Sequence, residues 1–346
     1  MIKSGDGFIQ AHLIRHRYLL LGIIVLGWIN SIVSFLLPLS IGEFFTVFFH
    51  TGSSKGKLLN WLGIEVTTAG QFFLLFSLLL GIKAILTFFE NYGTFFQGEL
   101  LVRNIRDKVF ASQMNWNPVW LQGRSYGKYL LRYSNDMKSI QLYMTKGYLE
   151  AIKSGLFLLT GLLLMVQIQA IVTLLFFILL FIGFLVVFRA ARYQSRSISE
   201  SRSARSSLLA HVAHSFSRFT RIKDHREEPE AIDTFREKSG TLFGANMKYN
   251  LTESLMLALV PLLIFGIIGL LLWQMEFLAD TITASEGLMM VLMILMMEGG
   301  VRRLLKVPSY INKGRISLQK INKLLNEPPL SSRPEKTREE ILDVTI

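Results

Sequence analysis

Long runs of apolar residues alternate along this chain with shorter polar and basic stretches. A helix needs about 20 mainly apolar residues to cross the hydrocarbon core of a bilayer. Six runs are long enough, and we predict that each of them spans a membrane: residues 18–49, 71–96, 148–166, 168–188, 252–275 and 287–305. Residues 1–17 are basic and weakly amphipathic, so they are predicted to form a short helix at the membrane interface.

Two connections between the predicted spans are long, near residues 98–147 and 190–251. They lack clusters of turn residues and carry apolar residues at helical spacing, such as Leu208, Val212 and Phe216. The membrane helices are therefore predicted to continue beyond the bilayer as two helical hairpins. The predicted fold class is all-α: a polytopic membrane protein whose six transmembrane helices extend into the cytoplasm as these two hairpins.

Basic residues concentrate at the N-terminus and in the two long connections, whereas the connection between the last two spans, "EFLADTITASEG", is acidic. Over 346 residues, 37 Lys and Arg outweigh 25 Asp and Glu, which gives a net charge of +12. Cytoplasmic segments of membrane proteins carry an excess of Lys and Arg. We therefore expect both termini and both hairpins on the cytoplasmic side of the cell (inner or plasma) membrane, with lipid rather than nucleic acid as a partner.

The sequence offers little catalytic chemistry. The chain has no cysteine, which excludes disulfides, thiol catalysis and cysteine-ligated metals. Paired carboxylates and His clusters with metal-ligand spacing are absent from the predicted spans, so we predict no catalytic residue and no metal site. The phosphate-binding motif G-x-x-x-x-G-K-[ST] is also absent from the sequence.

The first long connection carries the motif "GKYLLRYSND", in which Gly127, Tyr129-Leu130, Arg132 and Asp136 are similar to the pattern G-x-L-x-x-R-x-x-x-D. Further segments in the same order are "FLLPLSIGEFF", "SFSRFTRIKDHREEPEAIDTF" and "KGRISLQKINKLLNEPP". As an ordered set, they resemble the transmembrane domain of ABC exporters of the six-helix, domain-swapped type (the type 1 ABC transmembrane domain). We assign residues 18–326 to this domain and 327–346 to a linker or the start of a missing ATPase domain.

The resemblance implies that the chain is the transmembrane (permease) subunit of an ATP-driven exporter. A second copy or a homologue would complete the substrate pathway. An ABC ATPase domain or subunit, on another chain or on a longer form of this one, would bind ATP and Mg. No cofactor and no ATP hydrolysis are expected of this chain alone. The residues also leave open a membrane scaffold or sensor that uses the same fold without transport.

Each cytoplasmic hairpin in that family ends in a short coupling helix that rests on the ATPase. The resemblance places the first coupling helix at Trp116, Asn117, Pro118, Val119, Trp120 and Leu121. It places the second at Arg218, Phe219, Thr220, Arg221, Ile222 and Lys223. Large apolar side chains at a cytoplasmic tip are typical of a protein interface. The alternative is that the tryptophans lie at the bilayer surface, where Trp is common.

Ionisable residues deep inside a predicted span are candidates for a substrate pathway. Lys83 and Glu298 lie near the middle of their spans, and we predict that they line a polar cavity with Met293 and Met297. In the alternative interpretation, Glu298 forms a structural ion pair with Lys83, or with Arg302 one turn later. The methionines would then only pack against neighbouring helices.

Three further ionisable residues, Glu90, Glu150 and Lys153, fall near the cytoplasmic ends of their predicted spans. We place them at the inner membrane surface, where a long side chain such as Lys can reach the headgroups. The sequence does not select a substrate, and lipid, peptide and apolar drug all remain open.

Overall fold

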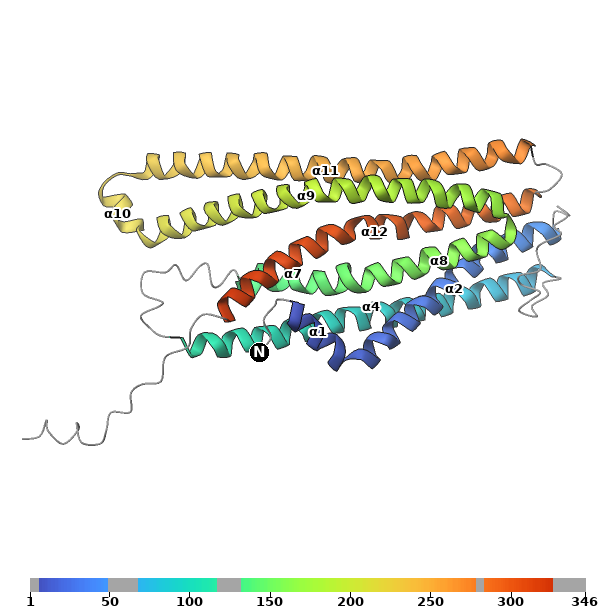
Figure 1. Cartoon of the computed structure of the whole chain (residues 1–346), viewed down its shortest axis with the longest axis horizontal. Helices are drawn as coiled ribbons and strands as arrows, with labels where there is room; N and C mark the ends of the chain where they lie inside the picture. Colours follow the sequence, from blue (N-terminus) through green and yellow to red (C-terminus); the bar gives the residue numbers. More distant parts are fainter. Residues whose placement is uncertain (1–5, 49–67, 117–131, 278–282, 326–346) are drawn as a thin grey trace, which may run out of the picture.

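Long helices that run along a common axis make up almost all of the described chain (Figure 1). The computed structural model describes residues 6–48, 68–116, 132–277 and 283–325. Its helices are α1 (Asp6–Arg15), α2 (Arg17–Phe48), α4 (Ala69–Met114), α7 (Met137–Leu142), α8 (Glu150–Ile168), α9 (Ala170–Ser217), α10 (Phe219–Asp224), α11 (Glu228–Phe277) and α12 (Ala284–Leu325). Two π-helical segments, η1 (Arg132–Asp136) and η2 (Tyr143–Leu149), flank α7 and continue the same rod into α8. No strand occurs in the described ranges, so the predicted all-α fold is confirmed.

Four helical segments of the described chain are long and apolar enough to cross a membrane: Arg17–Thr46, Ala69–Met114, Arg132–Ile168 and Glu228–Glu276. They cover four of the six predicted spans, the first of these as far as Thr46. A shorter apolar helix, Ala170–Gly183, lies at the start of the predicted fourth span. The predicted sixth span lies in α12, which is not among these four segments, so both of these spans stay predictions.

The helices extend beyond the length that a bilayer needs, as the sequence predicts. The longest are α4 with 46 residues, α9 with 48 and α11 with 50, so each is roughly 70 Å long or more. α4 begins with a capping box, in which the Gln71 N–H donates to the Thr68 hydroxyl and the Thr68 N–H donates to the Gln71 side chain. α9 and α11 pack side by side as a hairpin, with α10 at its tip (Figure 1).

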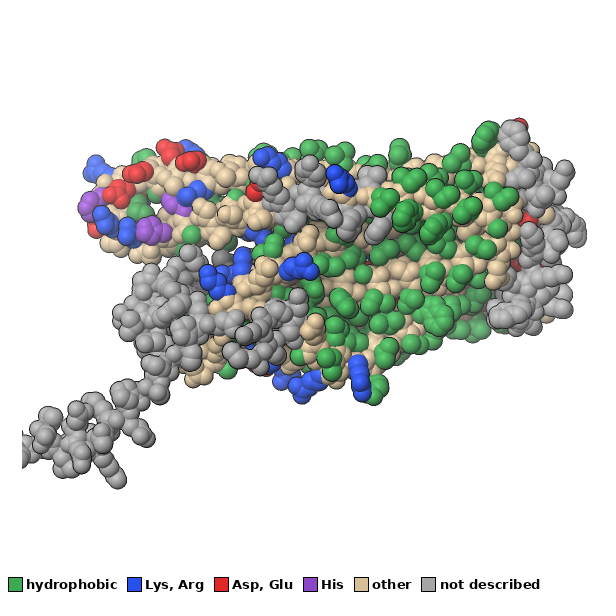
Figure 2. Space-filling model, in the orientation of Figure 1, with side chains coloured by type: hydrophobic (Ala, Val, Ile, Leu, Met, Phe, Trp, Pro, Cys, Tyr) green, Lys and Arg blue, Asp and Glu red, His purple; other side chains and the backbone are tan. Residues whose placement is uncertain are grey.

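The surface of the bundle divides into an apolar and a charged part. Figure 2 shows hydrophobic side chains over one half of the visible face and Lys, Arg, Asp and Glu gathered toward the hairpin tip. Large apolar residues are exposed on several helices, including Leu74, Phe88, Leu163, Leu174 and Leu262. An exposed apolar surface of this extent is expected to face lipid. The charged half then lies outside the bilayer.

Two apolar clusters hold the described helices together. The membrane cluster joins α2, α8, α9, α11 and α12, and its fully buried side chains include Phe35, Phe176 and Met290. The hairpin cluster joins α1, the start of α2, α4, α7, η2 and the end of α12, and Ile105 and Ile140 are fully buried in it. The first cluster lies where the apolar surface is, and the second stabilises the helices outside the bilayer.

Close packing of α8 within the membrane cluster depends on Gly161. A Cβ atom at this position would lie 2.6 Å from Cζ of Phe35 and 2.9 Å from Sδ of Met297. Phe35 has no exposed surface and stacks on Phe157 at 4.7 Å between ring centroids, so its ring has no space to move into. A Cβ atom added to Gly155, on the same helix, would have no such neighbour within 4 Å.

Gly161→Ala is therefore expected to lower the free energy of unfolding by about 1–3 kcal/mol, the usual cost of overpacking a core. Gly155→Ala is the matched control and should be neutral or stabilising by about 0.5–1 kcal/mol, because Ala favours a helix over Gly. Thermal unfolding of the purified variants in detergent measures both effects. Equal stability of the two variants would contradict this packing.

Candidate functional site

A polar cavity of about 410 Å³ lies between α2, α4, α8 and α12, within the part of the bundle that carries the apolar surface. Its polar lining comes from four helices and from η2. The charged residues among the described lining are Lys83, Glu90, Lys146, Glu150, Lys153 and Arg303. A hydrated or ligand-filled space is the usual reason for charged side chains at this depth.

The first carboxylate of the cavity, Glu90 of α4, holds a lysine of α8. The Lys153 Nζ lies 2.9 Å from Glu90 Oε1, and only 7% of the Lys153 side chain is exposed. Lys153 also donates to the Thr94 hydroxyl at 3.1 Å, and the Asn30 amide donates to Glu90 Oε2 at 2.7 Å. Glu90 therefore joins α2, α4 and α8 through hydrogen bonds and one ion pair. A paired buried charge with satisfied hydrogen bonds is tolerated where a lone one is not.

The second carboxylate, Glu150 of α8, holds an arginine of α12. The Arg303 Nε lies 2.8 Å from Glu150 Oε1 and 3.3 Å from the Ser154 hydroxyl, to which it donates. The Arg303 guanidinium also lies over the Phe157 ring, 5.9 Å from its centroid. This contact fixes α12 against α8 beside the cavity. Both carboxylates of the described lining are thus neutralised by one cation each.

Lys83 and Lys146 are the remaining cations of the described lining. Both side chains are partly buried, and neither forms an ion pair or hydrogen bond with a described residue. The cavity therefore carries an excess of positive charge that the described residues do not neutralise. Such a cavity can bind an acidic group of a ligand, because a partner of opposite charge removes the cost of holding the cations there.

The other three candidates that the sequence grouped with Lys83 lie elsewhere. Glu298 accepts from Arg302 Nε at 2.9 Å, one turn along α12, so the Arg302 pairing is the one observed and the Lys83 pairing is not. Met293 and Met297 have no exposed surface and belong to the membrane cluster. They pack between helices, which corrects the prediction that they line the cavity; Met296 reaches the lining instead.

The tip of the second hairpin is the short helix α10, which contains Phe219, Thr220, Arg221, Ile222 and Lys223, with Arg218 as its N-cap residue. None of its side chains is buried, and Phe219 is 54% exposed. The chain turns back after α10 through Arg226, whose φ of 56° lies in the left-handed region. The Glu227 N–H then donates to the Ile222 carbonyl at 2.9 Å and closes the turn.

Trp116 does not lie on an exposed tip. Its side chain is 6% exposed and belongs to the hairpin cluster, so the sequence-based expectation of an exposed apolar side chain is wrong for this residue. The rest of the first predicted coupling helix, Asn117, Pro118, Val119, Trp120 and Leu121, lies outside the described residues.

Sequence reasoning missed Asn30, Glu90, Lys153 and Glu150 as members of one site. Distance along each helix, taken separately, places the three charged residues of this group near a membrane surface. The sequence does hold one indication of this site. Acidic and basic residues on three predicted spans lie at similar distances from the cytoplasmic end, so their opposite charges could pair.

The fold and this cavity together define a multi-pass membrane protein whose helices enclose a polar, net positive space and continue into a projecting hairpin. The family model of the ABC transporter transmembrane region matches residues 20–298. The chain therefore belongs to the family of ABC transporter transmembrane regions. A similar curated protein is the ATP-dependent lipid A-core flippase of Pseudoalteromonas translucida (strain TAC 125), which is 22% identical over 266 residues. That match covers 74% of this chain and 44% of the flippase, so the chain spans less than half of its relative.

Glu90→Gln is expected to lower the free energy of unfolding by about 3 kcal/mol, because it leaves the charge of Lys153 buried beside a neutral amide. Adding Lys153→Met should restore most of this loss, since no unpaired charge then remains. Glu237→Gln, on the exposed surface of α11, is the control and should change stability by less than about 0.5 kcal/mol. Chemical or thermal unfolding in detergent gives all three values. If the double variant is as unstable as Glu90→Gln, the unpaired charge of Lys153 is not the cause of the lost stability.

Proposed function

We propose that this chain is the transmembrane subunit of an ATP-driven exporter in the cell membrane, with its termini and hairpins in the cytoplasm. A second copy or a homologue would complete the pathway, and an ABC ATPase domain or subunit would supply ATP binding, Mg binding and hydrolysis. The family membership and the long helices of the described chain support this proposal. ATP binding would close the ATPases and shift the helices between two arrangements of the cavity.

The observation that carries the proposal is the positive charge of the cavity between α2, α4, α8 and α12. Lys83 and Lys146 have no described counter-ion, and the surrounding helices are apolar. We infer that the substrate is an amphiphile with an acidic group, in which the acidic group meets these lysines and the apolar part contacts the helices. The name of the similar flippase, which refers to lipid A-core, agrees with a lipid of this kind.

The proposed contact with the ATPase includes α10. Phe219 is exposed at the tip, and the Nζ of Lys223 lies 5.9 Å from the centre of its ring and 2.9 Å from Oε1 of Glu228. These contacts restrict the movement of the Phe219 side chain. The hairpin tip on which it lies is outside the part of the bundle that faces lipid. Rigid exposed aromatic residues are typical anchors of protein interfaces. The first tip, for which Asn117–Leu121 remain candidates, would dock in the same way.

Lys83→Gln tests the cavity. The variant should keep basal ATP hydrolysis but lose stimulation by an acidic amphiphile, with an apparent affinity about tenfold lower, because one charge-assisted contact is removed. The measurement is vanadate-sensitive ATP hydrolysis by the chain reconstituted with its ATPase in lipid vesicles, titrated with acidic and zwitterionic lipids. Lys108→Gln, on the exposed part of the same helix, is the control and should behave as the wild type.

If Lys83→Gln and Lys108→Gln respond equally to acidic lipids, the cavity is not where the acidic group binds. If the chain purified from its host membrane together with its bound partners carries no ATPase activity at all, the alternative of a scaffold or sensor is favoured over the exporter.

Phe219→Ala tests the coupling contact. Loss of an interface anchor should weaken ATPase association by about 2 kcal/mol and reduce transport, with no change in thermal stability, because the side chain is exposed in the free chain. Phe243→Ala, at an exposed Phe on the limb of the same hairpin, should leave both properties unchanged. Co-purification of the ATPase and transport into inverted vesicles measure the two effects. Equal effects of the two variants would exclude α10 as the contact.

A further inference from the structure

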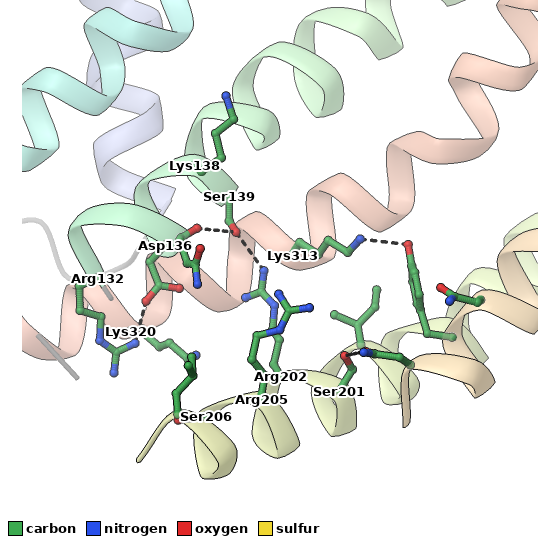
Figure 3. Close-up of a pocket in the computed structure, with 16 residues that line it drawn as sticks. Arg132, Asp136, Lys138, Ser139, Ser201, Arg202, Arg205, Ser206, Lys313 and Lys320 are labelled. Atoms are coloured by element: carbon green, nitrogen blue, oxygen red, sulfur yellow. Dashed lines mark hydrogen bonds and ion pairs between the residues drawn. The ribbon is translucent and has the colours of Figure 1, made fainter. Parts of the chain in front are cut away.

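A second cavity, of about 680 Å³, lies at the hairpin end of the bundle, between η1, α7, α9, α11 and α12. Its described lining carries one carboxylate, Asp136, and six basic side chains: Arg132, Lys138, Arg202, Arg205, Lys313 and Lys320. Figure 3 shows Arg202 and Arg205 projecting from α9 toward the side on which α12 carries Lys313 and Lys320. Basic groups from two separate helices therefore converge on one space.

The carboxylate in this cavity is already occupied. Asp136 Oδ2 accepts from Arg132 at 2.8 Å, and its Oδ1 accepts from the Ser317 hydroxyl at 2.8 Å. Lys138 donates to the Gln141 side chain at 2.8 Å and points away from the other cations in Figure 3. Four cations, on α9 and α12, then remain without a carboxylate partner among the described residues.

Two of these four cations have neutral partners that hold them in place. The Arg202 guanidinium donates to the hydroxyls of Ser317 at 3.2 Å and Ser139 at 3.1 Å. Lys313 donates to the Tyr249 hydroxyl at 3.0 Å and lies over the Tyr249 ring at 4.6 Å. Hydroxyl groups orient a cation without neutralising it. Arg202 and Lys313 are thus pre-organised and still positively charged.

The other two, Arg205 and Lys320, form no ion pair or hydrogen bond with any described residue. Burial lowers the pKa of Lys320, and the nearby Arg132 and Arg202 lower it further, against the opposing effect of Asp136. Burial likewise lowers the pKa of Lys313; Arg202 and Arg205 add to this, while Glu253 opposes it. The protein thus keeps like charges close together here at an electrostatic cost. A bound anion would remove that cost.

We propose that this cavity binds a phosphate-bearing anion with at least two negative charges, held by Arg202 and Arg205 of α9 and by Lys313 and Lys320 of α12. Arginine guanidinium groups match the geometry of phosphate oxygens, and lysines add point charges. The ligand would connect the α9–α11 hairpin to α12 and so oppose their separation. The site is distinct from the cavity around Lys83 and does not depend on the chain being an exporter.

The position of the site favours a water-soluble ligand over a lipid headgroup. Arg202 lies 14 residues after the predicted fourth span, and Lys320 lies 15 residues after the predicted sixth. At 1.5 Å per residue, both are roughly 20 Å beyond the predicted membrane boundary. The headgroup of a lipid that stays in the bilayer would have to leave the surface to reach them.

The test uses the full chain in nanodiscs of phosphatidylcholine, with inorganic pyrophosphate as the soluble probe. Calorimetric titration at low ionic strength should show binding to the wild type, and Arg205→Gln/Lys320→Gln should weaken it about tenfold or more. This variant should unfold at the same temperature as the wild type or higher, because neither residue has a described partner and like-charge repulsion is reduced. The matched control, Arg236→Gln/Arg315→Gln, removes the same charge from exposed positions on α11 and α12 and should bind pyrophosphate like the wild type.

A second arm separates the two possible sources of the phosphate group. Nanodiscs that contain phosphatidic acid replace the pyrophosphate, and protection against thermal unfolding is compared among the same three proteins. If the Arg205→Gln/Lys320→Gln variant loses the thermal protection by phosphatidic acid but still binds pyrophosphate like the wild type, the site belongs to a lipid headgroup. If the variant loses pyrophosphate binding, the site belongs to a soluble phosphate. The proposal is overturned if neither ligand binds the wild type, or if the site variant and the control variant bind equally.

Discussion

A polypeptide inside a bilayer has no water to hydrogen-bond with, so each backbone N–H and C=O must find its partner within the chain. α-Helices meet this requirement locally, and the described chain consists of them almost entirely. Because α4, α9 and α11 are not interrupted at the edge of the apolar surface, each runs as one rod from the membrane part into the hairpin part. α4 thus carries Glu90 of the cavity and, further along, Ile105 of the hairpin cluster, so a shift at one end of this helix is transmitted to the other.

Charged side chains occur in two different environments along these helices, one in the apolar part of the bundle and one outside it. In the apolar part, the two carboxylates of the described cavity lining are each matched to one cation, Glu90 to Lys153 and Glu150 to Arg303. Lys83 and Lys146 have no counter-ion among the described residues. Outside it, where water lowers the cost, four cations on α9 and α12 face one another. In both places neutral hydroxyl or amide groups hold charged side chains in position. Neutral groups therefore orient charged side chains both inside the apolar part of the bundle and outside it.

Much of the architecture could be predicted from the sequence because it follows from local patterns. The predicted continuation of the second span beyond the bilayer is observed in α4, which ends at Met114, and the near-direct junction of the third and fourth spans is observed at Gln169. The limbs of the second hairpin also follow from helical spacing, whereas the position of its short tip helix comes from the family resemblance. These features depend on neighbours in the chain, which a sequence displays directly.

Tertiary pairing could not be predicted in the same way. Glu90 and Lys153 are far apart in the sequence, and they meet because α4 and α8 both pack against α2. Met293 and Met297 share a span with the cavity but face the membrane cluster, because the rotation of α12 is set by its neighbours. Trp116 is buried in the hairpin cluster, among residues that lie far from it in the sequence.

The junction at Gln169 has a mechanical consequence. One extended residue separates α8 from α9, so the two helices cannot slide past each other, and relative movement is confined to rotation about this point. α9 is a lever of roughly 72 Å, so a rotation of about 5° at Gln169 would carry the hairpin tip through about 6 Å, while residues beside the joint hardly move.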